Sequence, residues 1–171
     1  MWAAISNDRK TELVHVPGNL TAQRYRDEIL QPHLMRVIDR QRELFQHNNA
    51  RPHTARLTRD YLQQNIINML PWPSKSSDLN PIEHLWDQLD KRVCQRQPPP
   101  QTLDQLRQML QQEWRTISRN NVRTVIDSMP RRCRAVLTAR GGHTRGTNLN
   151  VTGSVLNCDN LIFHQSLRFG L

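Results

Sequence analysis

The chain has 171 residues, of which 36% are hydrophobic, and its 24 Lys and Arg against 15 Asp and Glu give a formal net charge of +9 at pH 7. This length suits one domain, or one domain and a tail. The positive charge favours a polyanionic partner, with nucleic acid as the first candidate and a basic surface that binds nothing as the alternative.

Cysteine usage and hydropathy exclude several classes of protein. The three cysteines, Cys94, Cys133 and Cys158, are far apart and form no CxxC pair, so they indicate neither a disulfide framework nor a zinc ribbon. No apolar run approaches the ~20 residues of a transmembrane helix, and the N-terminus has no signal-peptide pattern. We therefore expect an intracellular protein without a membrane span.

The first 45 residues read as a hairpin, a helix and a strand. Trp2–Ser6 and Thr11–Val16 are short β-prone runs separated by a turn-rich spacer. Thr21 can cap a helix that carries Tyr25 and Ile29 on one face, and Pro32 should kink or restart that helix. Glu43–Phe45 is then long enough only for a short buried strand.

A polar cluster, FQHNNARPH (Phe45 to His53), follows this strand, and strand ends of this kind often carry the chemistry of α/β proteins. We expect Thr54 to cap the next helix, which carries Leu57 and Leu62, and Ile66–Leu70 to form another strand. The order β, β, α, β, α, β predicts an α/β layered fold.

The clearest local signal is a helix start. Asn80 is a good N-cap residue, Pro81 suits the first helical position, and Glu83 stands where a capping box places its acid. A buried stripe at helical spacing follows, formed by Ile82, Leu85, Trp86, Leu89 and Val93.

The C-terminal half is predicted to be helical. After a Pro-rich linker over 95–101, a helix should begin at Thr102 and bury Leu103, Leu106, Leu110, Trp114 and Ile117. Val122–Met129 suggests a further short helix, and Pro130 should open another that ends at Gly141-Gly142. Periodicity fades from His143 onward, so we expect a loosely ordered tail.

Glu83, His47 and His53 each allow two interpretations. From local sequence alone, Glu83 is better read as a capping residue than as a catalytic carboxylate. His47 and His53 can meet across the turn after the strand, but surface or capping histidines are the favoured interpretation. The chain has neither a GxSxG elbow nor a glycine-rich phosphate loop.

Two segments, NNARPHTAR (from Asn48) and LPWPSKSSDLNPIEHLWDQL (from Leu70), resemble the catalytic domain of mariner-type DNA transposases of the Tc-one superfamily. The resemblance covers roughly residues 2 to 145. In that family the matching motifs carry an aspartate at a strand end and a glutamate at a helix start. The 34 residues between Asn48 and Glu83 match the spacing typical of one branch of that family.

The resemblance implies a ribonuclease-H-like mixed sheet flanked by helices, in which three carboxylates hold two Mg²⁺ ions for phosphoryl transfer on DNA. With this resemblance, Glu83 is better interpreted as the family's third carboxylate, which also caps its helix. The resemblance also places Asn48 at the position of the second carboxylate, where a neutral amide cannot offset the charge of Mg²⁺.

The resemblance also predicts a missing element. The family's first carboxylate lies on a strand well before a Trp-x-x-x-Ser segment like Trp2–Ser6, and Asp8 lies too close to Asn48 to replace it. We expect residues 1–145 to form a partial catalytic domain that lacks this first strand, with the DNA-reading helix-turn-helix modules absent as well. The sheet should then have an unpaired edge, and residues 146–171 should form a divergent, loosely ordered tail.

We therefore expect the remnant of a cut-and-paste transposase, nuclear and catalytically inactive, that binds DNA. A homologous transposase subunit is a further candidate partner. Non-catalytic DNA or protein binding, and an active Mg²⁺-dependent nuclease, are the alternatives. Arg51, Lys75, Arg131, Arg132 and Arg134 are the candidate phosphate contacts, each of which can also be simply solvated.

Overall fold

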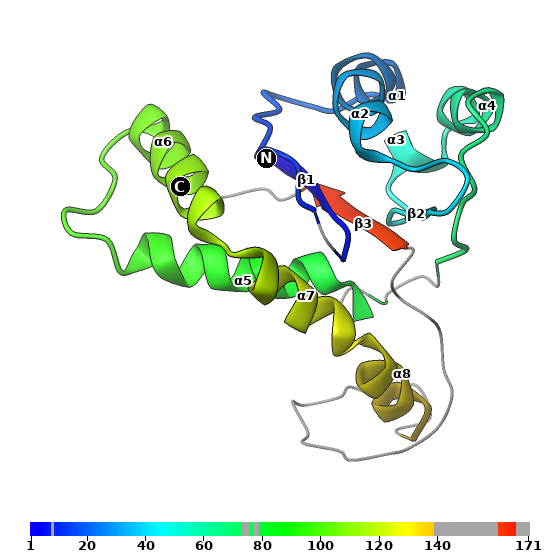
Figure 1. Cartoon of the computed structure of the whole chain (residues 1–171). Coiled ribbons are helices and arrows are strands. Elements are labelled where there is room, and N and C mark those ends of the chain that lie inside the picture. The colour runs from blue at the N-terminus through cyan, green and yellow to red at the C-terminus, as the bar shows by residue number, and fades with distance from the viewer. Residues whose placement is uncertain (8, 73–75, 77–78, 139–160, 167–171) are drawn as a thin grey trace.

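The computed structural model describes residues 1–7, 9–72, 76 and 79–138, and the backbone of residues 161–166. Within these residues a three-stranded mixed sheet lies between two groups of helices (Figure 1). Helices from residues 22–64 cover one face, and helices from residues 81–138 lie against the other. The predicted α/β layered arrangement is confirmed. In the part of the chain that the structure describes, each helix is too short or too polar to span a bilayer.

Strand β1, Trp2–Ile5, is buried on both faces. Its side chains alternate between two apolar clusters, as the period of two in a strand requires. Trp2 and Ala4 pack with Tyr25 and Phe45 in one cluster. Ala3 and Ile5 pack in the other cluster, which includes Leu85, Trp86, Trp114 and Ile126. A strand without a polar face therefore joins the two halves of the core.

The middle strand of the sheet comes from the C-terminal end of the chain. Strand β3, Leu161–Ser166, pairs antiparallel with β1 and parallel with β2, Leu44–Gln46, so the strand order is β1-β3-β2. The predicted loosely ordered tail is therefore wrong for Leu161–Ser166. A strand at the centre of a sheet need not alternate in sequence, so the apolar run Leu161–Phe163 that opens β3 gave no periodic signal. The predicted boundary at residue 145, and the rest of the predicted tail, lie outside the described residues.

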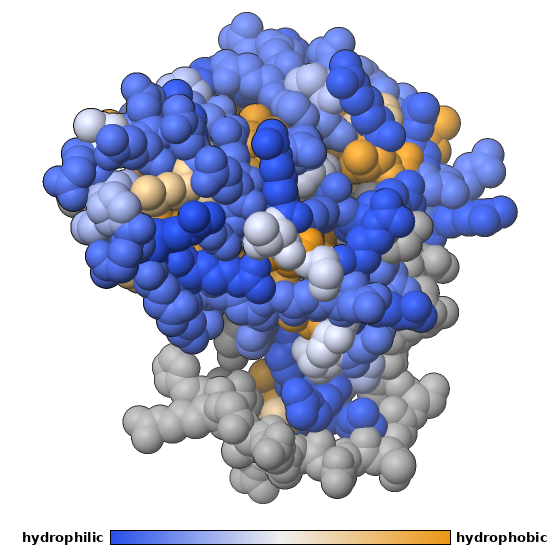
Figure 2. Space-filling view, turned by 60° about the vertical axis from the view of Figure 1, so that its left-hand side comes forward, coloured by the Kyte–Doolittle hydropathy of each residue, from blue (hydrophilic) through white to orange (hydrophobic). Residues whose placement is uncertain are grey.

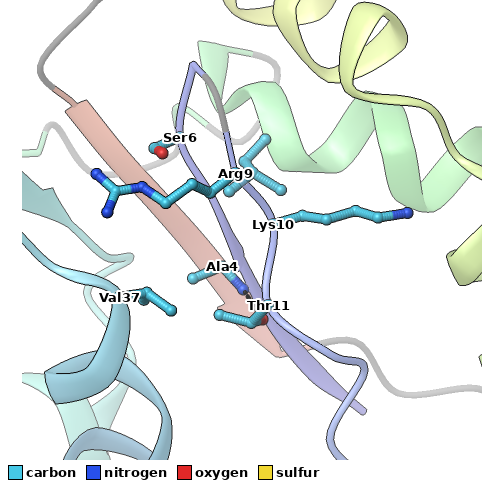
Figure 3. A pocket seen from close by; sticks show the side chains of 7 residues that line it. Ala4, Ser6, Arg9, Lys10, Thr11 and Val37 are labelled. Carbon is cyan, nitrogen blue, oxygen red and sulfur yellow. Dashed lines mark hydrogen bonds between the residues drawn. The ribbon is translucent and has the colours of Figure 1, made fainter.

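The hairpin after β1 is only partly regular. Trp2 and Val14 exchange two backbone hydrogen bonds of 2.8 Å, whereas Ile5 bridges to Lys10, so the register slips by one residue between these pairs. The Ala4 N–H donates instead to Oγ1 of Thr11, at 2.9 Å (Figure 3). The predicted hairpin is confirmed, but the prediction of a second regular strand over Thr11–Val16 is wrong because this hydroxyl interrupts the ladder.

Two basic side chains leave the hairpin turn in opposite directions (Figure 3). Arg9 donates to the buried carboxylate of Glu43 at 2.7 Å. Lys10 reaches the other way, and its Nζ donates to the carbonyls of Trp114, Arg115 (3.3 Å) and Ile117 (2.5 Å). Beside this turn lies a cavity of about 10 Å³, with room for about one water molecule. The turn thus ties β1 to the segment before β2 on one side and to the C-terminal end of α6 on the other.

The first helix runs without a break through its proline. It comprises α1 (Ala22–Arg24), a π-helix η1 (Tyr25–Leu34) and α2 (Met35–Val37). Thr21 caps it, as predicted, by accepting from the Arg24 N–H at 3.2 Å. The predicted restart at Pro32 is wrong. The wider π turns accommodate the ring, and the Met35 N–H donates to Leu30, five residues back.

The segment after η1 and α2 departs from two predictions. Strand β2 is followed by α3 (Arg51–Thr54) and α4 (Arg56–Gln64). Ala55, and not the predicted Thr54, is the N-cap residue of α4, because Thr54 is the last residue of α3. The predicted strand over Ile66–Leu70 is reduced to one parallel bridge between Phe45 and Met69.

The helices of the C-terminal half follow the predicted pattern closely. They are α5 (Pro81–Cys94), α6 (Leu103–Thr116), α7 (Arg119–Asp127) and α8 (Met129–Thr138). Asn80 and Thr102 cap α5 and α6 as expected, and Trp86 of α5 stacks on Trp114 of α6 at 5.1 Å. Leu103, however, is 65% exposed, so its predicted burial is wrong. The predicted helix end at Gly141-Gly142 lies outside the described residues.

A proline in β3 tests whether this strand holds the sheet together. We expect Ile162→Pro to lower the free energy of unfolding by about 3 kcal/mol or more, because a central strand has a ladder partner for each N–H. The melting temperature should fall by roughly 6–12 °C. Arg119→Pro is the control, since the first position of a helix tolerates proline. Equal melting temperatures for Ile162→Pro and Arg119→Pro would contradict the central placement of β3.

Removing the ammonium group of Lys10 tests the tie between the hairpin and α6. Lys10→Met keeps most of the apolar stem but removes the donors to the last carbonyls of α6, so we expect a loss of about 1–3 kcal/mol in the free energy of unfolding. Lys91→Met is the matched control, because Lys91 forms only an exposed pair with Asp87 and should cost about 0.5 kcal/mol or less. Chemical denaturation of both variants measures the difference.

Candidate catalytic site

The predicted site residues on the strand side gather at the end of β2. Beyond Gln46 the chain passes through His47, which is buried, and Asn48, which is half-buried, into the N-terminal end of α3. A cleft of about 790 Å³ opens here, lined by Thr21, Asn48, Arg51 and His53 among others. The polar cluster therefore lies at the mouth of a cleft, where strand-end chemistry is usually found.

The side chain of Asn48 is engaged within the protein. Its Oδ1 accepts from the Ala50 N–H at 3.2 Å and lies 2.6 Å from Nδ1 of His53. The contact with Ala50 fixes which atom of the amide is oxygen. Because that oxygen can only accept, Nδ1 of His53 must carry the proton. Asn48 therefore orients His53 and the start of α3.

His47 and His53 form a buried pair. The two imidazole rings stack, with 5.0 Å between their centroids and 10° between their planes. The ring of Tyr25 lies 4.3 Å from that of His53, centroid to centroid, and the Tyr25 hydroxyl forms a hydrogen bond of 3.4 Å with Nδ1 of His47. Burial lowers the pKa of His47 to about 3 and that of His53 to about 4, so both rings are neutral at pH 7. The favoured interpretation as surface or capping histidines is wrong for this pair, and the alternative, a meeting across the turn, is confirmed.

Two residues near this site carry no functional signal in the sequence. The spacing of Tyr25 indicates only a helix face and gives no sign of its contact with His47. Gln46 is fully buried, and both polar atoms of its amide lack a hydrogen-bond partner in the described structure. A buried amide of this kind costs free energy, and sequence alone gives no sign of it.

Glu83 lies on the first turn of α5 and is half-buried. Its backbone N–H donates to the carbonyl of the cap residue Asn80 at 3.1 Å, so the rigid start of the helix sets its position. Helix α5 contacts β3 directly. The carboxylate is therefore carried by an element packed on the central strand of the sheet.

The residues present do not fit a pair of Mg²⁺ ions. Among the described residues, no three His, Cys, Asp or Glu side chains come together as metal ligands. At the strand end the candidate metal ligand is the neutral amide of Asn48, and its oxygen already accepts from the Ala50 N–H and from Nδ1 of His53. Mg²⁺ sites rely on carboxylates for charge, and Glu83 is the one carboxylate among the predicted ligands.

The five candidate phosphate contacts are not brought together. Arg51 is exposed on α3, whereas Arg131, Arg132 and Arg134 lie on α8, on the other side of the sheet (Figure 1). Arg132 donates to the Val125 carbonyl at 3.3 Å and Arg134 to the Pro130 carbonyl at 3.2 Å. Lys75 lies outside the described residues. Hydrophilic side chains dominate the face shown in Figure 2, with small apolar areas between them.

Comparison with known proteins identifies the family. Residues 1–107 match the family model described as DDE superfamily endonuclease. The chain belongs to this family. It is 33% identical over 148 residues to the Tcb1 transposase of Caenorhabditis briggsae, covering 85% of this chain and 53% of that protein. The Tc1 transposase of Caenorhabditis elegans is 39% identical over 102 residues, covering 60% of this chain and 37% of that protein. The DDE-family chain thus spans about half the length, or less, of these relatives.

Solved structures support the fold of this DDE-family chain. The Mos1 transposase catalytic domain, determined with Raltegravir and Mg, matches with a TM-score of 0.67 and 22% identity, covering 81% of this chain and 71% of that one. The Mos1 strand transfer complex matches with a TM-score of 0.64 and 23% identity, covering 81% and 40%. The predicted ribonuclease-H-like fold is confirmed.

The buried histidine pair makes stability depend on pH. Because folding lowers both pKa values below the ordinary 6.5, the unfolded state binds more protons, and the free energy of unfolding should fall as pH drops from about 6.5 towards 4. The expected loss at pH 5 is about 2 kcal/mol for each histidine. Melting curves from pH 7 to pH 4.5 measure it. In the double variant His47→Gln/His53→Gln, the free energy of unfolding should depend much less on pH. His84 is exposed, so the control variant His84→Gln should keep the full pH dependence. An unchanged pH dependence in the double variant would contradict the lowered pKa values.

Proposed function

We propose that this chain is a transposase-related protein of the nucleus that binds DNA and does not cleave it. The absence of cleavage is supported by one observation, that the side-chain oxygen of Asn48 is already hydrogen-bonded within the protein. An amide stands at the strand end, and its oxygen faces the Ala50 N–H and the protonated Nδ1 of His53. Membership of a transposase family supports the first part.

The DNA-binding part is supported by charge and by the related structures. The net charge is +9, and Arg51 and Arg131 are exposed without a described side-chain partner, which leaves both guanidinium groups available for phosphate. Mos1 transposase has been solved in paired-end complexes, one of them with a left transposon end. A homologous transposase subunit is a further proposed partner of this chain.

Metal-dependent cleavage is the second candidate, and Glu83 is the observation that favours it. A carboxylate on the first turn of a packed helix is held rigidly, as a catalytic ligand requires. One such residue supplies a single negative charge, whereas two Mg²⁺ ions need several. We therefore place this candidate second.

Two measurements test the proposal. Purified protein should not nick supercoiled plasmid with Mg²⁺ or Mn²⁺, and Glu83→Ala should give the same result as the unsubstituted chain. Metal-dependent nicking that disappears in Glu83→Ala would establish the second candidate instead.

DNA affinity should fall steeply as salt rises, because each phosphate contact contributes about −0.9 to the slope of log K against log salt. Arg51→Gln and Arg131→Gln should each make the slope shallower by about 0.9 where that side chain contacts a phosphate. Arg123→Gln is the matched control, since Arg123 is paired with Asp127 at 3.9 Å. A flat salt response would remove DNA binding from the proposal.

A further inference from the structure

The turn that ends α4 has an unusual residue. Ile66 has φ of 57°, in the left-handed region that favours glycine. The N–H of Ile66 donates to the carbonyl of Gln63 at 3.0 Å, and that of Ile67 donates to Leu62 at 2.9 Å. These two bonds form a Schellman motif, whose left-handed position is usually glycine and sometimes asparagine. A β-branched residue there is strained.

Burial within the chain does not offset this strain. The side chain of Ile66 is 73% exposed. It lines a cleft of about 540 Å³, here named the α4 cleft, between α4 and the segment 66–72. Strain that persists where the side chain packs on little of its own protein indicates contact with something outside the chain.

The walls of the α4 cleft are apolar and aromatic. Leu62 of α4 lines the cleft together with Ile66, Met69 and Trp72 of the following segment, and the neutral rings of His47 and His53 also line it. Trp72 is tied to the candidate site, because its carbonyl accepts from Nδ2 of Asn49 at 3.0 Å. The cleft volume of about 540 Å³ lies within the usual range of pockets for small molecules.

A single cation adds a charge to this lining. Arg59 of α4 is exposed, and within the described residues its guanidinium has no hydrogen bond or ion pair. Arg56, one turn earlier, is instead paired with Asp60 at 3.5 Å. The α4 cleft thus offers apolar and aromatic faces beside one unpaired positive charge. A nucleotide carries the complementary features, a planar base and an anionic phosphate.

We propose that the α4 cleft receives an unpaired nucleobase of a DNA strand, with the base against Ile66 and Trp72 and the adjacent phosphate on Arg59. A duplex keeps its bases stacked, so the cleft selects single-stranded or locally opened DNA. This inference rests on the proposed DNA binding and deepens it, because it names the form of DNA that the protein takes.

Ile66→Gly separates a binding role from a structural one. Glycine suits the left-handed position, so the melting temperature should rise by roughly 2–4 °C. Affinity for a fluorescently labelled single-stranded oligonucleotide should fall about tenfold, within the range of a lost base contact. Leu137→Ala is the matched control: Leu137 is also 73% exposed but lies on α8, so its loss should leave binding unchanged.

Arg59→Gln provides a second variant that leaves the Schellman motif intact. It should weaken binding of the single-stranded oligonucleotide and make its salt slope shallower by about 0.7, the contribution of one phosphate contact on a single strand. Arg119→Gln, an exposed arginine at the start of α7, is the charge control and should change neither.

A duplex of the same length completes the experiment. The proposal predicts tighter binding of the single strand, with a preference that both Ile66→Gly and Arg59→Gln reduce. Equal binding of single strand and duplex, unchanged in both variants, would overturn the α4 cleft and leave general DNA binding intact; it would then favour a peptide or no ligand in the cleft. Failure to bind either form would overturn both this inference and the proposed function.

Discussion

The fold depends on the pairing of β3 with both of its neighbours. Within the described sheet β1 and β2 do not meet, and the six residues Leu161–Ser166 connect them, antiparallel on one side and parallel on the other. The register places Gln46 beside Phe163 and Ile5 beside the same residue, so the end of β2 is fixed relative to the hairpin turn. Helix α5, which carries Glu83, contacts the same strand. Both parts of the candidate site are therefore positioned by a strand that the chain supplies last.

Neutrality is the common feature of the strand-end side of the site. Asn48 carries no charge, and the rings of His47 and His53 are held neutral by burial beside Tyr25 and Phe45. The neutral amide of Asn48 is compatible with the neutral state of His53. A carboxylate 2.6 Å from Nδ1 of His53 would favour the imidazolium, and a buried ion pair would then need further polar partners to offset its desolvation. With an amide, the contact between Asn48 Oδ1 and Nδ1 of His53 is a hydrogen bond between neutral groups, which avoids the desolvation cost of a buried ion pair.

Sequence predicted the elements whose signal is local. The start of α5 was clear because Asn80, Pro81 and Glu83 each favour the same helix terminus, and Thr102 gave α6 in the same way. Non-local effects were not accessible. Pro32 predicts a kink or a restart of the helix, but burial of Tyr25, Ile29 and Leu34 against β1 and β2 favours a continuous helix that widens into π turns. The strand Leu161–Ser166 carries no period of its own, and only its two ladders reveal it. The resemblance predicts Asn48 and Glu83 as site residues. The packing of His53 against Tyr25 is a tertiary contact between distant parts of the chain, which the sequence pattern does not indicate.

The α4 cleft and the candidate site share residues. His47 and His53 contribute to the stacked pair and also line the cleft, and the bond from Asn49 to the Trp72 carbonyl joins the strand end to the cleft wall. The strained Ile66 lies on the same wall, in the segment bridged to β2 through Phe45 and Met69. A base bound in the α4 cleft would therefore lie against residues next to Asn48 in the chain, His47 and Asn49. The proposed binding of an unpaired base does not depend on the candidate metal ligands, because Asn48 is not among the residues that line the α4 cleft.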